Sequence, residues 1–108
     1  MNILFVHQNF PAQFRHLAPA LVRRGHHVVA TGVMPGPARN WQGVKLCPVA
    51  TRRSSTRGIH PWLIDLETKT IRGEACFHAA RQLAAAGFSP DVILAHPGWG
   101  ESLFLRHV

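Results

Sequence analysis

Two hydrophobic segments of the sequence each end in a histidine, and polar residues follow both. His7 closes the run that starts at Asn2, and His96 closes the run that starts at Val92. The candidate binding residues are His7, Gln8, Asn9 and Gln13 after the first segment, and His96, Gly98, Trp99, Gly100 and Glu101 after the second. Imidazole and amide groups suit a hydroxyl-rich ligand, and an imidazole can also carry a proton in a reaction. For His7, an ordinary polar residue at a strand end is the favoured interpretation over catalysis, whereas for His96 both interpretations stay open.

The second polar segment offers further contacts to a ligand. Gly98 and Gly100 allow the backbone to approach a ligand closely, and Trp99 can present a flat face to a sugar or a base. A helix that begins at Glu101 would point its free N–H groups at the ligand and favour a phosphate or a carboxylate. The alternative for Trp99 is simple packing over the end of the sheet.

A metal site at these residues is the less favoured interpretation. A catalytic zinc needs three protein ligands, and Glu101 is the only acidic candidate beside His7 and His96. Cys47 and Cys76 lack a CxxC or Cys/His spacing, so we expect reduced, structural thiols. We expect neither a metal nor another bound cofactor.

Four short apolar runs predict strands of a buried sheet. They are rich in valine, isoleucine and leucine, as is typical of strands covered on both faces. The predicted strands are Asn2–His7, His27–Thr31, Val44–Val49 and Val92–His96.

Three helical segments are expected between and after these strands. Apolar residues three and four apart predict the first, from Pro11 to Arg24, with Asn9 as its cap, Gly25 as its stop and a kink at Pro19. The second runs from His60–Pro61 to Gly87, and the third starts at Glu101. The expected packing face of the long helix is Leu63, Leu66, Thr70, Gly73, Phe77, Ala80 and Ala84.

The segment Thr51–Gly58 is polar and basic throughout, which predicts a mobile loop. Its arginines, Arg52, Arg53 and Arg57, are either solvated or hold a phosphate.

The order of these elements predicts a Rossmann-like open parallel sheet with flanking helices and right-handed crossovers. In the doubly wound order 3-2-1-4, the first and fourth strands are neighbours, and a crevice opens between their carboxyl ends. His7 and His96 would then face the same crevice.

Several common uses of such a sheet lack their required residues. The loop after the first strand contains neither GxxxxGK[ST] nor GxGxxG, which argues against a Walker loop and a dinucleotide site. The first acidic residue is Asp65, so no carboxylates follow the early strands to hold magnesium. A GxSxG nucleophile turn is also absent.

Composition limits the class of protein further. The 108 residues suffice for one domain, and twelve lysines and arginines against five acidic residues give a net charge of +7. No unbroken apolar run exceeds four residues, whereas a bilayer span needs about 20, and no secretory signal is recognisable. With reduced cysteines, this favours the cytoplasm. A basic α/β module that binds nucleic acid or another anionic partner is the alternative function, although the arginines are spread from Arg15 to Arg106.

Three long stretches carry recognisable motifs. They are NILFVHQNFPAQFRHLAPALVRRGHHVV (residues 2–29), HPWLIDLETKTIRGEA (60–75) and DVILAHPGWGESLFL (91–105). They resemble GT-B glycosyltransferases of family 4, in the subgroup that begins with an FVHQNFPxQFRHL run. The resemblance implies two facing Rossmann-like domains, the first holding mainly the acceptor and the second mainly the nucleotide-sugar donor. It also implies retention of the anomeric configuration without a metal.

Under this resemblance, residues 1–108 form the amino-terminal, acceptor-side domain, truncated within its last helical stretch and inactive alone. The loop of His7, Gln8, Asn9 and Gln13 would line the cleft, and His96 would be the catalytic residue near the donor sugar. Related enzymes often carry glycine where this chain has Ala12. The implied partners are a nucleotide-sugar donor and a carbohydrate or lipid-linked acceptor, with at most peripheral contact with the inner face of the membrane and no specific nucleic acid.

Overall fold

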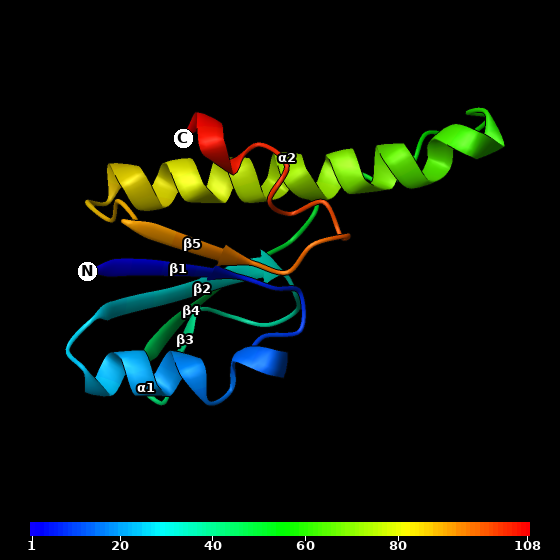
Figure 1. Ribbon diagram of the computed structural model, residues 1–108. Coiled ribbons are helices and arrows are strands. Elements are labelled where there is room, and N and C mark those ends of the chain that lie inside the picture. The colour runs from blue at the N-terminus through cyan, green and yellow to red at the C-terminus, as the bar shows by residue number, and fades with distance from the viewer.

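The protein is a five-stranded sheet with helices on both faces, in a computed structural model that describes residues 1–108 (Figure 1). The strands are β1 (Asn2–Val6), β2 (His27–Val33), β3 (Arg39–Trp41), β4 (Val44–Val49) and β5 (Val92–Ala95). They lie in the order β3-β4-β2-β1-β5, all parallel except β3. The four predicted strands therefore have the predicted order, and the Rossmann-like α/β fold is confirmed.

β3 is an edge strand that the sequence did not predict. It pairs antiparallel with β4 through a two-residue turn, in which Gln42 and Gly43 have φ values of 48° and 85°. Positive φ at both positions is the geometry of tight hairpins. The sequence gives no signal for this strand, because the strand has three residues and no apolar run.

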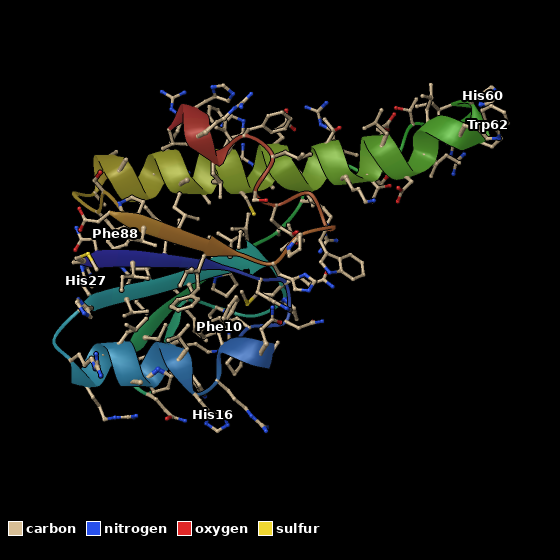
Figure 2. All side chains as sticks on the ribbon, in the orientation of Figure 1. Phe10, His16, His27, His60, Trp62 and Phe88 are labelled. Carbon is tan, nitrogen blue, oxygen red and sulfur yellow. The ribbon has the colours of Figure 1, made fainter.

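The core consists of two layers on either side of β1 and β2. Ile3 and Phe5 face the layer that contains Ala18 of α1 (Leu17–Arg23), and Phe10 lies in the same layer (Figure 2). Leu4 packs on the other face. Alternate residues of a strand point to opposite faces, so a continuous apolar run fills both layers.

The fourth predicted strand, β5, is less buried than its composition suggested. Val92 and Ile93 are 38% and 39% exposed. β5 pairs with β1 alone and so lies at the edge of the sheet. An apolar composition does not reveal whether a strand has one neighbour or two.

The first predicted helix is divided into two pieces. A 3-10 turn, η1 (Ala12–Phe14), precedes α1, and Pro11 rather than Asn9 stands at its start. Pro19 lies in the first turn of α1, where its missing N–H costs no helical hydrogen bond, so the predicted kink is wrong. Gly25, with φ of 88°, follows the end of α1 as predicted.

The long helix, α2 (Ile64–Ala85), keeps close to its predicted limits. The His60 ring accepts the N–H of Trp62 at 3.1 Å, and the 3-10 turn η2 (Pro61–Leu63) leads into α2. The amino-terminal part of α2 projects past the sheet, with His60 and Trp62 at its far end (Figures 1 and 2). The predicted packing face is therefore wrong in part. Of its members, Gly73 and Ala80 are buried and Phe77 is half-buried, whereas Leu63, Leu66, Thr70 and Ala84 are exposed.

The predicted third helix is absent. Residues 101–104 form turns, and only the 3-10 helix η3 (Leu105–His107) follows. Contacts with α2 hold this segment instead: Glu101 pairs with Arg72, and a Cβ on Gly73 would lie 2.8 Å from the Gly100 carbonyl oxygen.

The basic segment Thr51–Gly58 contains no helix or strand and lies beside α2. Arg53 pairs with Glu74 at 3.5 Å. Its mobility stays a prediction.

Candidate functional site

The two predicted histidines lie side by side at the carboxyl ends of β1 and β5. Val6 pairs with Ala95 in the parallel register, so the residues that follow both strands emerge together. The His96 N–H donates to the Val6 carbonyl at 2.9 Å. The ring centroids of His7 and His96 are 4.7 Å apart, with the planes inclined by 54°. The predicted meeting of the two strand ends is confirmed.

His7 is buried and held in one orientation. The residue is 6% exposed, and its ring Nδ1 accepts the N–H of Asn9 at 2.8 Å. The neutral ring therefore carries its proton on Nε2. Burial lowers the pKa of His7, and the neighbouring His96 lowers it further, while Gln13 and Glu101 act in the opposite direction. At neutral pH this ring is an uncharged donor.

His96 is half-buried, and its Nδ1 is a buried atom without a hydrogen-bond partner in the protein. Leaving a buried nitrogen unpaired is unfavourable, so such atoms usually bond to something else in the working molecule. Because Nδ1 is shielded from solvent, a bound molecule can meet only the accessible part of the His96 ring.

Sequence reasoning missed Arg72, which joins the two polar loops. From α2, its Nε and Nη2 donate to Glu101 Oε1 at 3.1 and 2.9 Å, and Nη2 donates to Gln8 Oε1 at 2.5 Å. Glu101 is 3% exposed. Its carboxylate therefore lies in a buried ion pair, and its contact with a ligand stays a prediction. The signal in the sequence is that Arg72 stands between Ile71 and Gly73, two residues without polar side chains, both of which are buried.

The remaining predicted residues differ in their exposure. Trp99 is 45% exposed. Gly98 and Gly100 have φ values of 93° and 95°. A Cβ at Gly98 would meet no atom within 4 Å, whereas at Gly100 it would collide with the Lys69 backbone. Gly98 and Trp99 thus remain open to a ligand, and Gly100 serves the packing of the loop on α2.

Asn9 and Gln13 are exposed in the first loop. A pocket of about 370 Å³ lies elsewhere, between β4 and α2, and includes none of the predicted site residues. No group of three or more His, Cys, Asp or Glu side chains is placed to hold a metal ion.

The fold and the site together define a class of protein: a Rossmann-like α/β domain with polar groups at the carboxyl ends of two adjacent parallel strands. Residues 24–108 match a family model described as Glycosyl transferase family 4 group, and the chain belongs to that family. β1 and the loop after it lie outside the match. No curated protein matches the chain, and no solved structure does.

Proposed function

We propose that the chain is the amino-terminal, acceptor-side part of a retaining GT-B glycosyltransferase. The complete enzyme would transfer a hexose from a nucleotide sugar to a carbohydrate or lipid-linked acceptor. The observation that carries the proposal is the contact of His7 with His96 at one edge of the sheet, in a chain of the family 4 group. Open α/β sheets bind their ligands at this edge.

In this proposal His96 is the catalytic residue and touches the donor sugar. Part of its half-buried ring is accessible to a sugar hydroxyl, whereas Nδ1 itself is shielded from solvent. His7, held neutral, offers its Nε2–H as a donor. Asn9 and Gln13 add exposed amide groups, and Trp99 offers a face on which a sugar ring can stack.

A second domain is part of the proposal for an electrostatic reason. Transfer breaks the bond between the anomeric carbon and the diphosphate, so negative charge develops on the leaving nucleotide. No helix begins at Glu101 to help bind that charge, and Arg72 is already paired with Glu101. We therefore assign the groups that bind the diphosphate to a donor domain outside these residues, and expect the chain alone to be inactive.

The proposed location is the cytoplasm, with at most peripheral contact with the inner face of the membrane. Neither helix combines the length and the apolar character that crossing a bilayer requires. Cys47 and Cys76 are both free thiols, which fits a reducing compartment.

A transfer assay with a panel of nucleotide sugars tests the proposal. The 108 residues alone should give no turnover, and robust transfer by them would contradict the two-domain mechanism. In the complete enzyme, His96→Ala should lower turnover about 10²-fold without loss of folding. His78→Ala, which removes an exposed histidine of α2, is the matched control. Unchanged turnover in His96→Ala would remove His96 from the catalytic role.

The distribution of arginines favours this function over nucleic-acid binding. Arg23 and Arg24 lie at the end of α1 on one face of the sheet, whereas Arg52 and Arg81 line a pocket beside α2 on the other (Figure 1). A nucleic-acid binder gathers its cations on one surface. Affinity for DNA that falls steeply with salt would support the alternative.

A further inference from the structure

Arg72 contacts both loops of the candidate site from a third element. Its side chain is 21% exposed, and it reaches Gln8, the residue after His7, as well as Glu101, five residues beyond His96. The guanidinium is planar and its donors are fixed relative to one another. Two acceptors bound to one guanidinium are therefore held at a defined separation.

Stability alone does not account for this arrangement. Taking an arginine and a carboxylate out of water is costly, and apolar residues of similar size often stabilise a protein as well or better. The contacts of Arg72 with both loops indicate a role in fixing their geometry.

The backbone beside Arg72 supports the same arrangement. The next residue is Gly73, and a Cβ there would lie 2.8 Å from the Gly100 carbonyl oxygen and 3.0 Å from the Phe104 ring. The missing side chain lets the second loop pack directly on α2, one residue before Glu101. The Gly73 contact determines how close the second loop lies to α2, and Arg72 determines the orientation of the Glu101 carboxylate.

We propose that Arg72 is a positioning residue: through Gln8 and Glu101 it holds the two loops so that His7 and His96 present their rings to one bound molecule. The proposal rests on the function proposed above for the identity of that molecule. The positions of Gln8, Arg72 and Glu101 are properties of the chain alone.

The position of Gln8 governs His7 directly. The N–H of Asn9, the residue after Gln8, is the donor that fixes the His7 ring. If Gln8 is released from Arg72, this short segment loses one of its anchors, and the contact from Asn9 to His7 opens more often. Histidine tautomers and amide exchange report that opening without any enzyme assay.

NMR of the 108-residue chain tests the proposal with two variants. Gln8→Leu removes one arm and leaves the ion pair, and Arg72→Met/Glu101→Leu removes the whole cluster without leaving an unpaired charge. Arg81→Met is the matched control, because Arg81 is an exposed arginine of the same helix. In both test variants, Asn9 amide exchange should become about tenfold faster. The His7 nitrogen shifts should move toward a mixture of tautomers, and Arg81→Met should change neither.

A second readout uses the complete enzyme. Gln8→Leu should lower kcat about tenfold with a smaller change in KM, since misplaced groups act mainly on the reacting geometry. Retained His7 tautomer and Asn9 exchange in folded Gln8→Leu would overturn the proposal, even if the double variant failed to fold. A wild-type enzyme without transfer activity would overturn the proposed function alone, because the NMR result would stand.

Discussion

The ion pair between Arg72 and Glu101 permits a quantitative test of how the second loop is held on α2. The two side chains are 21% and 3% exposed, so Arg72→Met leaves a carboxylate shielded from water without a partner. Breaking a buried pair in this way costs about 3–5 kcal/mol. Small domains have a total stability of only about 5–15 kcal/mol. The variant should therefore lose a large share of its stability and melt at least about 12 °C below the wild type.

Urea unfolding followed by circular dichroism measures the loss, provided that the m-value stays constant. Arg72→Met/Glu101→Leu should recover most of the stability, because neither charge then remains in the interior. Lys69→Met is the control: Lys69 pairs with Asp65, but the two side chains are 38% and 79% exposed, and the loss should be about 0.3–0.5 kcal/mol. A loss below about 1 kcal/mol in Arg72→Met, or a double variant as unstable as the single one, would refute the reasoning.

The pKa of His7 is lowered by burial from its ordinary value of 6.5. As the pH falls below 6.5, the unfolded chain therefore binds a proton on His7 more readily than the folded chain does. Stability should fall with the pH in this range, and the pH dependence should be smaller in His7→Asn. Ala12 has φ of 39°, so Ala12→Gly should stabilise the chain by about 0.5–1 kcal/mol in urea unfolding. Burial raises the pKa of Cys76 to about 12, with Glu101 adding to the effect. A thiol reagent at pH about 8 should therefore leave Cys76 unmodified until the chain is unfolded.

If the free energy of unfolding of wild type and His7→Asn changed equally with pH, groups other than His7 would account for the loss of stability at acid pH. For Ala12, the control is Ala20→Gly inside α1, which should destabilise by about 0.5–1 kcal/mol; a loss of similar size in Ala12→Gly would show that the positive φ carries no strain. Rapid modification of Cys76 in the native chain would show that it is accessible.

The sequence alone determined the central sheet and the meeting of its two histidines. Apolar runs such as Ile3–Val6 mark strands that need cover on both faces, and the preference for right-handed crossovers then limits the strand order. With β1 and β5 adjacent, His7 and His96 had to share one edge. These signals are local, or follow from general rules of chain topology, and so can be recognised without coordinates.

Tertiary structure decided how the loops beyond those histidines are held. The segment after Gly100 has helical composition, yet packing on α2 and the Arg72–Glu101 pair keep it out of an α-helix. No feature of the sequence near Arg72 indicates that Glu101 and Gln8 are its partners. Residues distant along the chain come together only after the helices and strands pack. At the Arg72–Glu101 pair, the balance between the cost of desolvation and the gain from pairing depends on burial, and only the folded structure defines how buried the pair is.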